Sequence, residues 1–493
     1  MTDEKTDRHW HTLDRDLGRI ASVEYATQIA ARPMVGIGIA LAFIIVAALA
    51  AAIFFVGTSS SYVVVAAAAV GAYMAVNIGA NDVANNMGPA VGANAMSMGV
   101  AIAIAAIFES AGALLAGGDV VSTISKGIID PQSVAGNDVF IWAMMAALIS
   151  SAVWVNLATW VGAPVSTTHS VVGGVMGAGI AAAGFSAVNW PTMGAIAASW
   201  VISPVLGGVI AALFLWFIKS TIIYQDDKIA AARKWVPVLI GLMAGVFATY
   251  LTMKGFKKII TVDLGTAMLI GLAIAVVVYA VSRPLVRRQS EGLENRNKSL
   301  KVLFAIPLVL SAALLSFAHG ANDVANAVGP LAAIVHAEQF GEFAGKVNIP
   351  LWVMVIGAFG ISFGLILFGP KLIRMVGSQI TKLNPMRAYC VALSAAITVI
   401  VASWLGLPVS STHIAVGGVF GVGFFREYHA EHRLRQSKAA RPEATRIAPE
   451  ERRRRKLVRR SHFMTIIAAW VITVPAAAIM SGVIFWALHA AFV

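Results

Sequence analysis

The stretch GANDVANNMGP, from Gly79 to Pro89, decides the fold, because it occurs a second time as GANDVANAVGP, from Gly320 to Pro330. Nine of the eleven positions are identical, although about half of the chain lies between the two copies. A repeat that only packed a core would keep large apolar residues, whereas this one keeps a carboxylate, amides, glycines and a proline. The duplication therefore indicates polar chemistry that is needed twice.

Each copy adjoins a long apolar run, Ser61–Ile78 before the first and Val302–Ala318 before the second. A carboxylate that faces lipid in such a run is unfavourable by about 2.5 kcal/mol or more. We therefore expect Asp82 and Asp323 to have partners inside the protein. The alternative is that each carboxylate is a structural group, bonded to a neighbouring asparagine or to the backbone.

The composition is that of an integral membrane protein. Of the 493 residues, 58% are hydrophobic and 12% are charged, whereas about a quarter are charged in a soluble domain, and the mean hydropathy is +0.79. Apolar stretches of about 17 to 25 residues recur, the length that a helix needs to cross the bilayer. The alternating pattern of a membrane barrel is absent, so the expected fold class is all-α. The single cysteine, Cys390, excludes an internal disulfide and a cysteine metal cluster.

Twelve or thirteen transmembrane helices are expected, depending on whether the short glycine-rich segments cross the bilayer fully. The expected spans are 34–57, 61–80, 95–117, 138–161, 165–185, 191–218, 235–253, 263–282, 302–320, 350–369, 386–405, 409–425 and 463–490. The expected parts of the chain are a cytoplasmic segment 1–33, an additional span 34–57, a first repeat 61–218, linking helices and basic loops 219–301, and a second repeat 302–493 with a basic insertion 424–462.

Basic loops predict the orientation of the chain, because short cytoplasmic loops are rich in Lys and Arg. Residues 424–462 contain thirteen Lys and Arg and residues 283–301 contain six, so both loops are expected inside, as is 219–234. Counting spans between them places the first GANDVAN copy near the cytoplasmic end of its helix and the second near the outer end of its own. The two repeats are therefore expected to be inverted, with the N-terminus cytoplasmic and the C-terminus outside.

A second repeated element supports the duplication: GAPVSTTHSVVGG at 162–174 matches GLPVSSTHIAVGG at 406–418. Hydroxyl residues after a proline and before an apolar run are typical of a helix start. A helix start offers free N–H groups and a partial positive charge, which suit a tetrahedral oxyanion. Two such starts, from broken or re-entrant-type helices, are expected to converge near the midplane. The residues expected to bind an anion of the phosphate type are Ser166, Thr167, Thr168, Ser410, Ser411 and Thr412.

The alternative for these hydroxyls is that they only cap helices, as in most proteins; their duplication beside the two aspartates favours binding. An anion about 5 Å from a carboxylate is repelled by roughly 3 kcal/mol at an effective dielectric of 20, so a cation has to accompany it. Carboxylate and amide oxygens suit hard cations, including sodium. The expected coupling-cation residues are Asn81, Asp82, Asn85, Asn322, Asp323 and Asn326. This arrangement predicts symport.

Three titratable residues are further candidates for a proton relay: Glu109 lies in the middle of an expected span, and His169 and His413 end the hydroxyl motifs. An internal hydrogen bond to another helix is the alternative for Glu109. For the two histidines, the alternative is that they orient the loops.

Several function classes are excluded or disfavoured. The chain has neither a GxxxxGK[ST] loop nor an HExxH helix, so neither ATP nor catalytic zinc is expected, and no cofactor. The net charge of +13 reflects membrane orientation and not nucleic-acid binding, because no nucleic-acid fold accompanies it. The chain is not expected to be an enzyme, although a membrane-embedded phosphotransferase, a sulfate symporter and an anion channel remain alternatives.

On the duplicated GANDVAN motif and the PVS[ST]TH motif, the chain resembles the inorganic phosphate transporter (PiT) family, in particular its bacterial low-affinity phosphate permeases. The resemblance covers the chain from about Ser61 onward and implies cation-coupled phosphate symport. Applied to this sequence, the resemblance implies that the binding residues are the hydroxyl residues, asparagines and aspartates given above. It also implies that Asp82 and Asp323 take part in binding phosphate as well as the cation. One departure is Asn86, where the second copy has Ala327.

The coupling ion is expected to be H+ or Na+. Bacterial chains resembling this one are commonly proton-driven, which favours protons; the paired Asn and Asp residues suit sodium equally well. The expected partners are inorganic phosphate, the coupling ion and the lipid bilayer of the bacterial inner membrane, a homodimer being compatible with the sequence.

Overall fold

The structure is a computed structural model that describes residues 34–55, 61–134, 136–161, 165–255, 262–341, 349–375, 383–440 and 460–493. Among these residues, eleven helices are long and apolar enough to cross a membrane, and the β-structure consists of a single isolated bridge between Ile129 and Val188. The all-α membrane fold is thereby confirmed. The expected segment 1–33 and much of the basic insertion, 441–459, lie outside the described residues.

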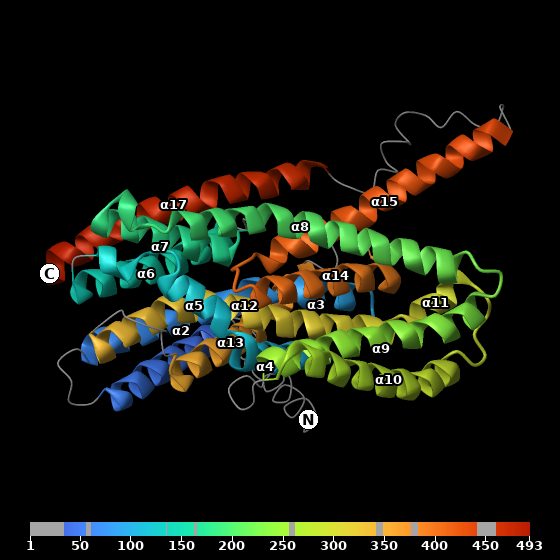
Figure 1. Ribbon diagram of the computed structural model, residues 1–493, viewed down its shortest axis with the longest axis horizontal. Helices are drawn as coiled ribbons and strands as arrows, with labels where there is room; N and C mark the ends of the chain where they lie inside the picture. Colours follow the sequence, from blue (N-terminus) through green and yellow to red (C-terminus); the bar gives the residue numbers. More distant parts are fainter. Residues whose placement is uncertain are drawn as a thin grey trace, which may run out of the picture.

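The helices of the first half follow one another along the chain (Figure 1). They are the N-terminal helix Met34–Phe54, α2 Ser61–Asn81, α3 Val83–Gly92, α4 Met98–Ala116, α5 Gly118–Lys126, α6 Asn137–Val161, α7 Thr167–Ala183 and α8 Trp190–Ile218. Short turns lie at η1 Pro131–Ser133, η2 Phe185–Ala187 and η3 Lys219–Ile223. The linking helices are α9 Lys228–Lys254, α10 Leu264–Gln289 and α11 Asn297–Leu303.

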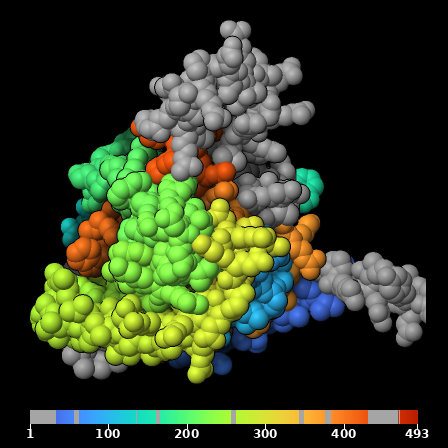
Figure 2. Space-filling view, turned by 90° about the vertical axis from the view of Figure 1, so that its right-hand side faces the viewer, coloured from blue at the N-terminus to red at the C-terminus, as the bar shows by residue number. Residues whose placement is uncertain are grey.

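The second half contains α12 Ala305–Phe340, α13 Leu351–Met375, α14 Pro385–Trp404, α15 Ser411–Ala440 and α17 Arg460–Phe492. The linking pair α9 and α10 pack along each other. Together with α11 and the end of α8, they form the end of the molecule that faces the viewer in Figure 2. The far part of α15 extends beyond this helix bundle (Figure 1).

The GANDVAN copies lie in the middle of long helices, so the expectation that they end their spans at 80 and 320 was wrong. Asp323 is the nineteenth of the 36 residues of α12. Asp82 lies at the junction of α2 and α3, which together cross as one helical segment, Tyr62–Gly92. Polar residues mark a membrane boundary only where they would face lipid. Those of both motifs face other helices, so the helices continue through them.

The two hydroxyl motifs open the glycine-rich helices for which the sequence left full crossing of the bilayer open. With 17 residues, α7 is only about 26 Å long at 1.5 Å per residue, shorter than the roughly 30 Å of hydrocarbon. Its counterpart α15 is longer but becomes polar beyond Phe425. These two helices bring their first turns to the level of the aspartates.

Glycines inside the motifs permit the closest helix contacts in the core. A Cβ atom at Gly320 would overlap the carbonyl oxygen of Glu109 in α4, and a Cβ atom at Gly79 would overlap that of Ile361 in α13. The backbone of α12 therefore lies directly on α4, and the backbone of α2 lies directly on α13. These matching contacts place Glu109 and Ile361 at equivalent positions of the two halves.

Candidate functional site

The two hydroxyl motifs start their helices in the same way. Ser166 precedes α7 and its Oγ accepts a hydrogen bond from the His169 backbone N–H, at 3.3 Å. Ser410 precedes α15 and accepts from the His413 backbone N–H, at 3.4 Å. The prediction that each motif opens a helix is confirmed. In each motif, the N–H groups of the first turn lack partners within the helix and project outward from its N-terminus.

Hydroxyls from both motifs meet at the first aspartate. Thr167 Oγ1 donates to Asp82 Oδ2 at 2.7 Å, and Thr412 Oγ1 donates to Asp82 Oδ1 at 3.3 Å. The Asp82 side chain is buried. Because Thr167 and Thr412 come from different halves of the chain, this carboxylate joins the two helix starts at one place.

The asparagines connect the two halves crosswise. Asn85 of the first copy donates to Thr412 Oγ1 of the second hydroxyl motif, at 2.9 Å. Asn326 of the second copy donates to Thr167 and Thr168 of the first hydroxyl motif, at 3.3 and 3.1 Å. Each GANDVAN copy therefore contacts the helix start contributed by the other half.

A chain of buried polar side chains runs from the second aspartate to α4. His319 Nε2 lies 3.1 Å from Asp323 Oδ2, and His319 Nδ1 lies 2.6 Å from Glu109 Oε2. On the other side of the carboxyl group, Asn86 Nδ2 donates to Glu109 Oε1 at 2.9 Å. A side chain that carries a proton can pass it along such a line, because imidazole accepts at one nitrogen and donates at the other.

The charges of the two copies share a small volume. One side-chain oxygen or nitrogen each of Asp82, His319 and Asp323 lies within 4.8 Å of the others. In the described part of the chain, Asp323 Oδ1 and Asn326 Oδ1 are buried acceptors without a hydrogen-bond partner, and Ser411 Oγ is a buried hydroxyl without one. These oxygens are free to bind a cation and, for Ser411, to donate to an anion.

The first asparagine of each copy holds the helix that leads into a hydroxyl motif. Asn81 Oδ1 accepts from Thr159 at the end of α6, at 2.9 Å. Asn322 donates to Ser403 at the end of α14, at 2.9 Å, and accepts from the backbone N–H of Val409, at 3.1 Å. Both amides thereby fix the approach of the chain to its helix start.

The two copies differ in exposure. Asn81 and Asn85 of the first copy are half-buried and Thr159 is exposed. At the matching positions of the second copy, Asn322, Asn326 and Ser403 are each 1% exposed. Within the two GANDVAN copies as the structure describes them, the partly exposed asparagines therefore belong to the first copy.

His169 and His413, expected as members of a proton relay, lie against each other. Their ring centroids are 5.0 Å apart, and the His169 ring is 3.8 Å from the Trp200 ring. Trp200 Nε1 donates to the carbonyl of Pro408, just before the second hydroxyl motif, at 3.1 Å. The third candidate, Glu109, has His319 and Asn86 as partners instead.

Sequence reasoning missed His319, although a signal was present. His319 directly precedes the second GANDVAN copy, and the residue before the first copy is Ile78. An ionisable residue inside an apolar run is a candidate functional group by default. Because the first copy has Ile78 at the matching position, a comparison of the residues shared by the two copies does not identify His319.

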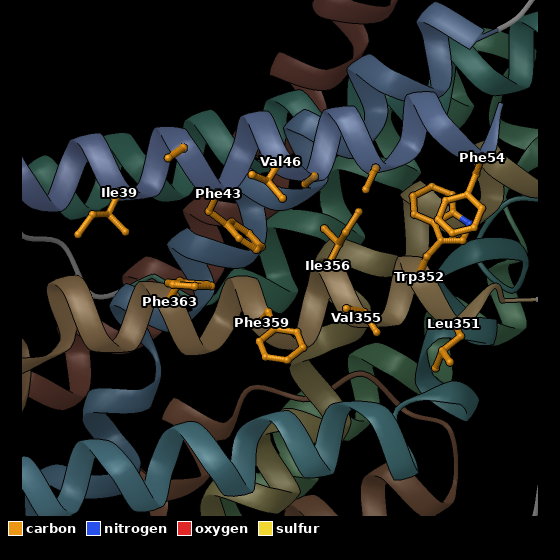
Figure 3. Close-up of a pocket in the computed structure, with 13 residues that line it drawn as sticks. Ile39, Phe43, Val46, Phe54, Leu351, Trp352, Val355, Ile356, Phe359 and Phe363 are labelled. Atoms are coloured by element: carbon orange, nitrogen blue, oxygen red, sulfur yellow. The ribbon is translucent and has the colours of Figure 1, made fainter. Parts of the chain in front are cut away.

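An apolar hollow lies away from this site, between the N-terminal helix and α13 (Figure 3). Its volume is about 870 Å³, and its lining consists of apolar and aromatic side chains such as Phe43, Phe54, Trp352 and Phe363. An oxyanion would lose its hydration there without gaining hydrogen bonds. This groove is therefore unsuited to phosphate.

Comparison with known proteins adds independent information. A sequence profile of the phosphate transporter family matches residues 78–481. A protein of Helicobacter pylori described as a phosphate permease is 45% identical, over 96% of this chain and 98% of its own length. One of Pyrococcus abyssi with the same description is 36% identical, over 84% of this chain and 95% of its own length.

A plant relative and a solved structure extend the likeness. The chloroplastic inorganic phosphate transporter 2-1 of Arabidopsis thaliana is 35% identical, over 84% of this chain and 70% of its own length. A structure described as the sodium-dependent phosphate transporter is 34% identical and superposes with a TM-score of 0.78, covering 87% of this chain and 99% of its own.

Proposed function

Because the chain belongs to the phosphate transporter family, we propose that it imports inorganic phosphate by symport with a cation. The observation that carries the proposal is the convergence of Thr167 and Thr412, from two separate helix starts, on the buried Asp82. The family consists of transporters and not of enzymes, in agreement with the sequence-based expectation. A membrane-embedded phosphotransferase is therefore not proposed.

In the proposed mechanism, phosphate binds between the first turns of α7 and α15. The N–H groups there and the Ser411 hydroxyl, which has no partner within the described residues, donate to the phosphate oxygens. Thr167 and Thr412 exchange their bond to Asp82 for one to phosphate or bridge the two. Because Asp82 and Asp323 repel the anion, a bound cation is needed before phosphate can stay.

We further propose that the halves are inverted repeats which alternate in opening to the two sides of the membrane. Equivalent residues of the two halves touch each other in two places: Ser110 Oγ lies 2.7 Å from Ser362 Oγ, and His169 contacts His413. Self-contact of equivalent residues is what a pseudo-two-fold axis produces, and inverted repeats serve alternating access in other transporters. The proposed location is the bacterial inner membrane, with the N-terminus inside and the C-terminus outside.

The proposed coupling ion is a proton. The line Glu109–His319–Asp323 consists of groups that bind and release protons, as in intramembrane proton relays. Sodium is the second candidate, because the solved relative is described as sodium-dependent and free oxygens of Asp323 and Asn326 are present.

We expect the purified protein, reconstituted in lipid vesicles, to accumulate phosphate under an imposed pH gradient in the absence of sodium. The measurement is uptake of labelled phosphate, with arsenate and sulfate as competitors. Collapse of the gradient by a protonophore should stop accumulation. Accumulation that requires a sodium gradient would overturn proton coupling. Stronger competition by sulfate than by arsenate would overturn the assignment of phosphate as the substrate.

We expect Thr167→Ala and Ser411→Ala each to weaken phosphate binding by about ten- to a hundred-fold, since a hydrogen bond to a charged group contributes roughly 1.5 to 3 kcal/mol. Phosphate affinity is measured by counterflow in vesicles. Ser170→Ala is the matched control: its hydroxyl lies in the same helix but donates to the Ser166 carbonyl, at 2.9 Å. Unchanged affinity in both test variants would mean that these hydroxyls only cap helices.

A further inference from the structure

Asn86 is a buried amide used on one side only. It is 1% exposed, and its Nδ2 donates to Glu109 Oε1 at 2.9 Å. Its Oδ1 is buried and has no hydrogen-bond partner within the described residues. Leaving a buried acceptor unpaired is unfavourable by about 1 to 3 kcal/mol, so the position is not explained by packing alone.

The second half has no equivalent of this polar group. The matching glycine contacts pair Glu109 with Ile361, and alignment of the motif copies pairs His319 with Ile78 and Asn86 with Ala327. All three polar residues are thus replaced by apolar ones. The amide is therefore present in the half of the chain that has the carboxyl group and absent from the half that lacks it, which indicates that it serves the carboxyl group and not the motif.

An amide can satisfy a carboxyl group in either protonation state. When Glu109 is ionised, Asn86 Nδ2 donates to it, as observed. When Glu109 carries a proton on the oxygen that faces Asn86, a half-turn of the amide brings Oδ1 to the same place, where it accepts from the hydroxyl. Oδ1 is then paired and Nδ2 takes its former place, so the amide keeps one hydrogen bond to the carboxyl group in either protonation state.

We propose that Asn86 is the positioning residue that holds Glu109 against His319 in both protonation states and so sets the pH range in which Glu109 takes up a proton. The inference rests on the proposed function for its readout, which is phosphate uptake. It does not require the proton to be the driving ion.

Few other ionisable groups face Glu109. On α12 these are His319 and Asp323, with Asp82 next to them. α13 also packs on α4 and presents Ser362, which is bonded to Ser110 one residue from Glu109; its basic residues, Lys371 and Arg374, lie at its far end. α3 has none. Helices α5 and α9 also pack on α4. Their ionisable residues include the Asp119–Lys254 ion pair.

The test is the pH profile of phosphate uptake in vesicles for the full-length protein and two variants. Asn86→Ala removes the hydrogen bond of the amide in both protonation states, but the bond to the ionised carboxylate is the stronger one because it involves a charge, so the pH of half-maximal uptake should rise by about one unit. Asn86→Asp keeps the shape but places a second carboxyl group beside the first, and two adjacent carboxyl groups share a proton. Its midpoint should rise further than that of Asn86→Ala.

The upward direction holds for either coupling ion, because in both cases the protonated form of Glu109 is favoured. Ser362→Ala is the matched control: it removes a buried hydrogen bond beside Glu109 without touching the carboxyl group, and its midpoint should equal that of the unmodified protein. A merely structural Asn86 would instead leave the midpoint of Asn86→Ala at that of the unmodified protein and lower its uptake equally at every pH.

An unchanged midpoint in Asn86→Ala would overturn the inference. If Asn86→Ala does not reach the vesicles, Asn86→Leu, which has nearly the same size and also lacks the amide, replaces it with the same expected rise. Failure of the proposed function gives a different result, since the unmodified protein would then accumulate no phosphate at any pH.

Discussion

Asp82→Asn and Asp323→Asn should each reduce gradient-driven phosphate accumulation by about a hundred-fold or more. Two carboxylates within 4.8 Å of each other attract a cation at that distance by roughly 3 kcal/mol each at an effective dielectric of 20. The amide keeps the size of the side chain, and its one oxygen can still accept from Thr167 at position 82 or lie beside His319 Nε2 at position 323, but it removes that attraction. Uptake of labelled phosphate into vesicles, normalised to the amount of inserted protein, measures the effect.

The same chemical change away from the site provides the control. Asp263 caps α10 by accepting from the Thr266 backbone N–H, at 3.0 Å, and asparagine caps a helix equally well. Asp263→Asn should therefore transport normally. Retained accumulation in both Asp82→Asn and Asp323→Asn would show that the cation binds elsewhere.

Gly320→Ala should strongly lower the yield and thermal stability of the folded protein and abolish phosphate uptake. An added Cβ would overlap the Glu109 carbonyl, so α12 would have to move off α4, and the line from Asp323 through His319 to Glu109 would separate. Because the obstacle is backbone and not a flexible side chain, rearrangement is expensive, and overpacking of a core already costs about 1 to 3 kcal/mol in milder cases. Thermal stability in detergent and uptake in vesicles are the two measurements.

Gly99→Ala is the control for helix propensity. Gly99 lies in α4, and a Cβ there would meet no atom within 4 Å, so alanine should be neutral or stabilising by up to about 1 kcal/mol. A Gly320→Ala protein with the melting temperature of Gly99→Ala would show that α12 and α4 are not held in the contact described.

The duplicated motifs predicted most of the site, because shared polar residues in apolar surroundings are conspicuous. Asp82, Thr167 and Thr412 were expected near one another from their pattern alone, and the structure places them in hydrogen-bond contact. The helix-starting role of Ser166 and Ser410 also follows from local chemistry, which a sequence displays directly.

What the sequence concealed depends on tertiary contacts. Helix α12 continues through Asp323 since other helices cover that residue, and hydropathy cannot tell a polar residue facing protein from one at a membrane boundary. The link from Glu109 to His319 joins residues that are 210 positions apart, and no repeat points to it because only one half carries it.

The unequal exposure of the two copies has a kinetic consequence. Asn81 and Asn85 keep part of their surface exposed, whereas Asn322 and Asn326 are each 1% exposed. If a cation binds at these residues as proposed, an ion beside Asn81 and Asn85 has fewer side chains to displace on leaving than one beside Asn322 and Asn326. On the proposed function, the second copy would therefore release its ion more slowly than the first.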